Sequence, residues 1–196
     1  MKVATTIMKH FYLCLKLNNE VKQMAEIAEA MDNIDVNVED VVSREGKYLA
    51  FTLANEEYGV DILKIKEIIG MMPITSVPQT PVFLKGVINL RGKVIPIVDL
   101  RLKFGMQSID YTDRTCIVVV EIAGQEENLL MGSIVDTVSE VLNIKEEEIE
   151  DAPSFGSKLK TDYILGMAKT KEGVKILLDI DKVLSSDELI VIENIS

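Results

Sequence analysis

Apolar and polar positions alternate in short blocks from residue 47 onward, which is typical of β-strands. Residues 47–54 read KYLAFTLA, residues 55–57 are turn-like, and residues 58–61 read YGVD, so this stretch predicts a hairpin. Isoleucines then recur on one side of residues 62–69, which favours one or two amphipathic helical turns.

A second pair of strands follows an irregular, proline-containing connection. Residues 83–90 and 94–100 are largely apolar and flank Arg91-Gly92-Lys93, a turn signal. Pro96 lies within the second of these strands, which predicts an edge strand or a bulge because proline lacks a backbone donor.

The same order of features recurs in the second half of the chain. Residues 115–122 and 128–135 predict another hairpin, and residues 136–144 repeat the apolar spacing of residues 61–69. The intervals from Gly86 to Asp99 and from Gly166 to Asp179 are equal in length, and each contains a turn glycine, Gly92 or Gly173.

Many short strands with little helix between them favour barrels over a parallel sheet. We therefore predict a mainly β fold with two small β barrels that arose by internal duplication. Residues 187–195 predict a C-terminal helix that is too short to be stable alone and so packs on a barrel.

The first 46 residues have a different character and form an atypical N-terminal extension, helical or disordered. Residues 23–31 carry apolar side chains at helical spacing. Residues 2–17 resemble a secretory signal only loosely, because Lys16 interrupts the apolar run. One hypothesis is that Met24 or Met31 is the native start.

Composition narrows the function. The net charge of −11 disfavours nucleic acid and anionic lipid as partners, and charged residues interrupt every apolar run before it could span a bilayer. The two cysteines, Cys14 and Cys116, are too few for a disulfide scaffold, so we expect a cytoplasmic protein with Cys116 buried as a small hydrophobe.

Candidate catalytic chemistry is sparse. His10, the single histidine, lies outside the duplicated region, so no histidine-based triad or metal site can be built there. Residues 86–94 imitate a phosphate loop but have Val94 where a hydroxyl is required. Asp179 and Asp181 could bind calcium, but acids at a helix start have a simpler structural role. We expect no catalytic residue, metal or cofactor.

Three motifs together carry a resemblance to a known family. They read YGVDILKIKEI over residues 58–68, FLKGVINLRG over residues 83–92 and VIPIVDLR over residues 94–101. This combination resembles the CheW family of bacterial chemotaxis coupling proteins. The resemblance covers residues 47–196 and implies two five-stranded SH3-like subdomains, at about 47–113 and 114–180, followed by a C-terminal helix at 181–196.

The resemblance also implies a function: a non-enzymatic adaptor, recruited to membrane receptor arrays, that joins chemoreceptor cytoplasmic tips to the regulatory domain of the histidine kinase CheA. It places a receptor groove between the subdomains, with a kinase contact at Lys85 and Gly86. The implied groove residues are Ile65, Glu67, Arg91, Val138 and Val141.

Each of these assignments has a structural alternative. The three groove aliphatics could be ordinary core, Glu67 and Arg91 could form an internal pair, and Gly86 could be required by the backbone. For the whole chain, the alternatives are a regulatory domain cut from a CheA-type kinase and a calcium-binding β module. A fused adaptor with a phosphate-receiver domain would need more residues than this chain has.

Overall fold

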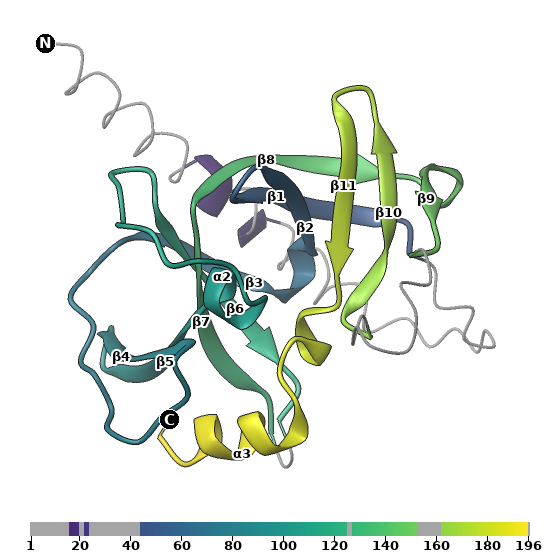
Figure 1. Ribbon diagram of the computed structural model, residues 1–196. Helices are drawn as coiled ribbons and strands as arrows, with labels where there is room; N and C mark the ends of the chain where they lie inside the picture. Colours follow the sequence, from purple (N-terminus) through teal and green to yellow (C-terminus); the bar gives the residue numbers. More distant parts are fainter. Residues whose placement is uncertain (1–15, 20–21, 24–43, 125–126, 153–161, 196) are drawn as a thin grey trace, which may run out of the picture.

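The computed structural model describes residues 16–19, 22–23, 44–124, 127–152 and 162–195, which form two β-sheets (Figure 1). Sheet A has the spatial order β8-β1-β2-β11-β10-β9, and sheet B has the order β3-β6-β7-β5-β4. The strands of sheet A are β1 (Gly46–Leu53), β2 (Glu56–Asp61), β8 (Thr137–Ile144), β9 (Ile149–Glu150), β10 (Ile164–Thr170) and β11 (Gly173–Leu178). Those of sheet B are β3 (Ile65–Gly70), β4 (Leu84–Leu90), β5 (Lys93–Asp99), β6 (Cys116–Ile122) and β7 (Leu129–Val135).

Short helices connect strands or follow the last strand, and the mainly β prediction is confirmed. They are η1 (Ile62–Lys64), α2 (Leu100–Lys103), η2 (Glu146–Glu148), η3 (Ile180–Lys182) and α3 (Ser186–Glu193). Among the described residues, no helix is long and apolar enough to cross a membrane. His10, Cys14 and nearly all of the helix predicted over residues 23–31 lie outside the described residues.

The two halves of the chain exchange their hairpins. The β1–β2 hairpin pairs with β8 and β11, whereas β3, β4 and β5, which follow it in sequence, join the β6–β7 hairpin in sheet B. The subdomain limits expected at residues 47–113 and 114–180 therefore do not coincide with the sheets. Turn signals locate strands, but they carry no information about which hairpin a later strand joins.

Two glycines show that the sheets are built alike. Gly59 pairs with Leu177 in the parallel β2–β11 ladder, and Gly132 pairs with Ile97 in the parallel β7–β5 ladder. A Cβ atom on Gly132 would lie 2.4 Å from Ile97 Cδ1, and one on Gly59 would lie 2.9 Å from Leu177 Cδ2. The predicted duplication is thus a structural one, with a glycine at the same close approach in each sheet.

Two local predictions are wrong. Residues 62–69 form the single turn of η1, which Asp61 caps by accepting a hydrogen bond from Leu63 N, and then enter strand β3. Pairing with β6 outweighs the helical spacing of the isoleucines. Strand β5, which contains Pro96, lies between β4 and β7 and is not an edge strand.

Pro96 is tolerated because no strand needs a hydrogen bond from its nitrogen. Its partner on β4 is Val87, whose backbone N–H and C=O are both bonded to Thr75 on the far side, so the Val87–Pro96 pair is not a hydrogen-bonded one. The ladder between β5 and β7 begins one residue later, at Ile97. The bulge lies in β4, between Leu84 and Gly86.

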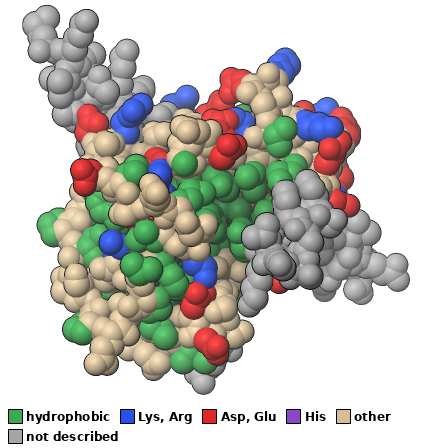
Figure 2. All heavy atoms as spheres, in the orientation of Figure 1, with side chains coloured by type: hydrophobic (Ala, Val, Ile, Leu, Met, Phe, Trp, Pro, Cys, Tyr) green, Lys and Arg blue, Asp and Glu red, His purple; other side chains and the backbone are tan. Residues whose placement is uncertain are grey.

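The largest hydrophobic cluster lies between the sheets. Strand β6 is buried on both faces: Val118 and Val120 belong to this inter-sheet cluster, whereas Ile117 and Val119 face the interior of sheet B. A separate, smaller cluster that includes Tyr48 fills the interior of sheet A. Figure 2 shows hydrophobic side chains gathered in the middle of one face of the molecule, between the two sheets.

The C-terminal helix packs on the fold, as predicted. Ser185 caps α3 by a capping box with Glu188, and Ile192 is buried in the inter-sheet cluster. Lys103 Nζ lies 2.5 Å from the Glu188 carboxylate and 4.8 Å from the centre of the Phe83 ring. Burial raises the pKa of Glu188, but the hydrogen bonds from Lys103 and Ser185 outweigh this effect and lower the pKa overall.

We predict that Gly132→Ala lowers the free energy of unfolding by about 1–3 kcal/mol, because the added methyl overlaps Ile97 and Ile117 in a packed interior. Chemical denaturation measures this. Gly70→Ala is the matched control, since a Cβ there meets nothing within 4 Å. Equal stability of the two variants would contradict the close approach of β7 to β5.

We also predict that Glu188→Gln lowers the melting temperature at pH 7 but not at pH 3. A carboxyl group whose pKa is lowered on folding stabilises the folded state above its unfolded pKa, and this contribution is lost as the pH falls through the folded pKa. The wild-type and variant melting curves should therefore converge in acid. A constant difference between them from pH 7 to pH 3 would rule out the ion pair with Lys103 as its source.

Candidate functional site

The ion pair between Glu67 and Arg91 joins two distant elements of sheet B. Glu67 lies on β3, one edge of the sheet, and Arg91 lies in the turn between β4, the other edge, and β5. Arg91 Nη2 donates to Glu67 Oε1 at 2.7 Å. The contact therefore joins β3 to the β4–β5 turn across sheet B, and Glu67 and Arg91 do form the internal pair that the sequence left as an alternative.

Arg91 occupies a strained backbone position. It has φ 53° and Gly92 has φ 88°, and Leu90 pairs with Lys93, so the connection is a two-residue turn with positive φ at both central residues. Asn or Gly is usual at the first of these positions. Asn89 instead supports the turn by accepting a hydrogen bond from Gly92 N at 2.9 Å. A bulky residue held in this region is a signal of function.

A pocket of about 240 Å³ opens beside this ion pair. Its floor is apolar and its rim carries charge, so it combines shape with a few polar anchors, as binding sites do. The Arg91 side chain is 78% exposed and that of Glu67 is 21% exposed, so the arginine can reach a partner. The lining residues are Lys66, Glu67, Leu90, Arg91, Lys93, Ile95, Val119 and Leu130.

The three predicted groove aliphatics meet in the inter-sheet cluster. Ile65 begins β3, and Val138 and Val141 lie on β8, so they come from the edge strands of the two sheets. Ile65 and Val138 are 1% and 3% exposed, and Val141 is partly buried against the same cluster. The structure brings these residues together, but only Val141 of the three presents appreciable surface.

The two predicted kinase-contact residues lie on β4. Lys85 is partly exposed, whereas Gly86 is buried with φ 134°, and a Cβ atom on it would lie 2.1 Å from Thr75 O. The bridge between Thr75 and Val87 therefore requires glycine at position 86. This backbone role accounts for Gly86 by itself.

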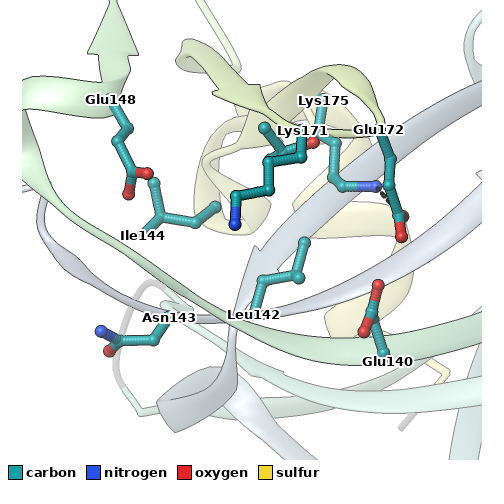
Figure 3. Close-up of a pocket in the computed structure, with 9 residues that line it drawn as sticks. Glu140, Leu142, Asn143, Ile144, Glu148, Lys171, Glu172 and Lys175 are labelled. Atoms are coloured by element: carbon teal, nitrogen blue, oxygen red, sulfur yellow. Dashed lines mark ion pairs between the residues drawn. The ribbon is translucent and has the colours of Figure 1, made fainter.

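Sheet A carries a second pocket at the equivalent place, about 290 Å³ in volume (Figure 3). Lys171 opens the β10–β11 turn as Arg91 opens the β4–β5 turn, and Glu140 stands in VSEVL of β8 where Glu67 stands in IKEII of β3. Lys171 extends over this pocket, and among the described residues it forms no ion pair with Glu140.

The interior of this second barrel contains, beside its apolar cluster, an ion pair at a position where the first barrel has apolar side chains. Lys175 forms an ion pair with Glu57, and its side chain is only 2% exposed. Each of the two residues precedes by two positions a member of the Leu177–Gly59 pair of the β11–β2 ladder. The corresponding residues of sheet B are Ile95 and Leu130. Sequence reasoning missed this pair and the burial of Lys175. The alternation in VKILL of β11 was a signal for it, because it puts Lys175 on the inner face.

The carboxylates considered for calcium have structural partners. Asp179 caps η3 and pairs with Lys182, and Asp181 accepts from Ala123 N and lies 2.5 Å from Lys64 Nζ. Within the described residues, no group of three or more His, Cys, Asp or Glu side chains could hold a metal ion. Residues 86–94 form a hairpin, not a loop that could cradle a phosphate.

The comparisons with known proteins agree with one another. A family model described as a CheW-like domain matches residues 47–188. The chain is 45% identical over 150 residues to the chemotaxis protein CheW of Klebsiella aerogenes, covering 76% of this chain and 88% of that protein. It is 34% identical over 144 residues to the chemotaxis protein CheW of Thermotoga maritima, covering 72% and 89%.

A solved structure matches as well. The crystal structure of the scaffolding protein TtCheW from Thermoanaerobacter tengcongensis superposes with a TM-score of 0.65 at 37% sequence identity, covering 74% of this chain and 95% of that one. The family match begins at residue 47, so residues 1–46 lie outside it.

Proposed function

The chain belongs to the CheW family of chemotaxis coupling and scaffold proteins, and on this premise we propose that it couples the cytoplasmic tips of chemoreceptors to the regulatory domain of a CheA-type histidine kinase. The protein acts from the cytoplasm, is recruited to receptor arrays and catalyses no reaction. The observation that carries the proposal is the exposed arginine at a strained turn, paired with Glu67 beside an apolar pocket.

The receptor site lies along the edge of β3. A receptor tip is a helical hairpin, and a helix docks best in an apolar groove with polar anchors at its rim. We place this groove between the edge strands β3 and β8, at Ile65, Val138 and Val141, which belong to or pack against one apolar cluster. Glu67 and Arg91 form its polar rim, where the guanidinium can pair with a carboxylate of the partner.

The kinase site lies at the other edge of sheet B, around Lys85 on β4. Lys85 precedes Arg91 by six residues, a distance of roughly 20 Å along an extended strand. Gly86 contributes by letting Thr75 approach β4 closely, which shapes this edge. Because Lys85 and Arg91 lie near opposite ends of β4, the protein can bind both partners at once, as a coupling protein must.

We predict that Arg91→Glu weakens binding of the purified protein to a chemoreceptor tip fragment by ten-fold or more, because two carboxylates then face each other at the rim and a partner carboxylate is repelled. Calorimetric titration measures the affinity. The melting temperature should change little, since an exposed ion pair contributes about 0–1 kcal/mol. Unchanged affinity together with an unchanged melting temperature would contradict the proposal.

Two further variants separate direct contact from turn support. Lys171→Glu is the matched control, because it makes the same charge change at the equivalent turn of the other barrel. The double variant Glu67→Arg/Arg91→Glu restores an ion pair with reversed polarity. Weak binding by the double variant would show that the partner contacts the Arg91 side chain directly. Recovered binding would show that Arg91 acts only through its ion pair with Glu67.

A further inference from the structure

Residues 16–19, which lie outside the family match, dock against the edge of β3. They form a short helical segment, drawn in purple in Figure 1, in which Leu17 is buried and Asn19 is exposed. The contacts of Leu17 and Asn18 are specific enough to suggest what the segment does.

Asn18 bonds to the free edge of β3 as a neighbouring strand would. Its Nδ2 donates to the Ile68 carbonyl at 2.8 Å, and Ile68 N donates to its Oδ1 at 2.6 Å. Edge strands leave such groups unpaired, and each unpaired group is a docking point for another chain. Ile68 directly follows Glu67, so Asn18 occupies the strand edge beside the Glu67–Arg91 rim.

Leu17 fills apolar space between the sheets. It is 2% exposed and belongs to the same cluster as Ile65, Ile68 and Val138, with Val141 packed against that cluster. These residues come from the two edge strands, β3 and β8, which the predicted receptor groove requires. Leu17 therefore lies in the same apolar cluster as the residues of the predicted receptor groove.

We propose that Leu17 and Asn18 are an internal ligand of the groove between β3 and β8, and that a helical partner must displace them in order to dock. The inference rests on the proposed function, since it concerns the same groove. The partner that fits is a helix that offers an aliphatic side chain in place of Leu17 and a side-chain amide or hydroxyl that can bond to the Ile68 backbone in place of Asn18.

Competition of this kind lowers the apparent affinity by the fraction of molecules in which the groove is open. Burial of one leucine is large enough to keep most molecules closed. Weakening the internal ligand should therefore strengthen partner binding, which is the opposite of what loss of an ordinary core contact would do.

The test uses the full chain and a purified chemoreceptor tip fragment as the probe. We expect Leu17→Ser to bind the fragment roughly ten-fold more tightly than wild type, because loss of the buried apolar surface of the leucine raises the fraction of molecules with an open groove. Asn18→Ala should bind severalfold more tightly, and it is the milder variant if Leu17→Ser does not fold. Asn19→Ala is the matched control and should bind as wild type does, because Asn19 is exposed. If the wild-type protein binds the fragment and the folded Leu17→Ser and Asn18→Ala variants bind it equally or more weakly, the inference is overturned.

Amide hydrogen exchange gives a readout that needs no partner. Loss of the Asn18 side chain should speed exchange of the Ile68 amide, and Asn19→Ala should leave it unchanged. Unchanged exchange at Ile68 in Asn18→Ala would overturn the docking itself. If no form binds the receptor fragment while exchange responds as expected, the proposed receptor function fails and the displacement inference falls with it, although the docking of the segment stands.

Discussion

The apolar layer between the two sheets is the interaction on which the rest of the structure depends. A row of stacked aromatic rings crosses it: Phe51 on Tyr58, Tyr58 on Phe104, and Phe104 on Tyr163, with centroid separations of 5.9, 5.9 and 5.1 Å. This packing holds together the β1–β2 hairpin, Phe104 at the end of α2, and Tyr163 just before β10. Because the hairpins are exchanged, neither sheet is complete without strands from both halves of the chain.

This arrangement explains how a duplicated fold acquired two unlike faces. In both sheets a glycine, Gly59 or Gly132, allows the same close approach between two strands. Where sheet B has Ile95 and Leu130, however, sheet A has the ion pair of Lys175 and Glu57. Lys175 is almost fully buried in this pair, and such a pair adds little stability compared with apolar packing. The two equivalent turns differ as well. Arg91 in the β4–β5 turn forms an ion pair with Glu67, whereas Lys171 in the β10–β11 turn forms none with Glu140 among the described residues.

Much of the fold follows from local patterns. The hairpins, the duplication and the C-terminal helix were predictable, because turn residues and apolar alternation are short-range signals. The pairing of the hairpins was not, since partner choice depends on packing across the whole chain. The strand β3 was missed for the same reason: IKEII fits a helix or a strand until β6 covers it.

The candidate site was also only partly predictable from the sequence. The resemblance gave Glu67 and Arg91 before any geometry was known, and the structure brings them to 2.7 Å of each other. Ile65, Val138 and Val141 also belong to or pack against one apolar cluster, but Leu17 of the same cluster lies in an extension that no motif explained. A single leucine beside an asparagine has no sequence signature as a groove ligand.

The central claim is that one protein holds two partners together, and the most direct measurement is assembly of all three components. Analytical ultracentrifugation should be run on this protein mixed with a CheA regulatory domain and a receptor tip fragment from the same organism. We expect each partner to bind alone and the three to sediment together as one species. Two mutually exclusive binary complexes, or no complex with a folded kinase domain, would contradict the account.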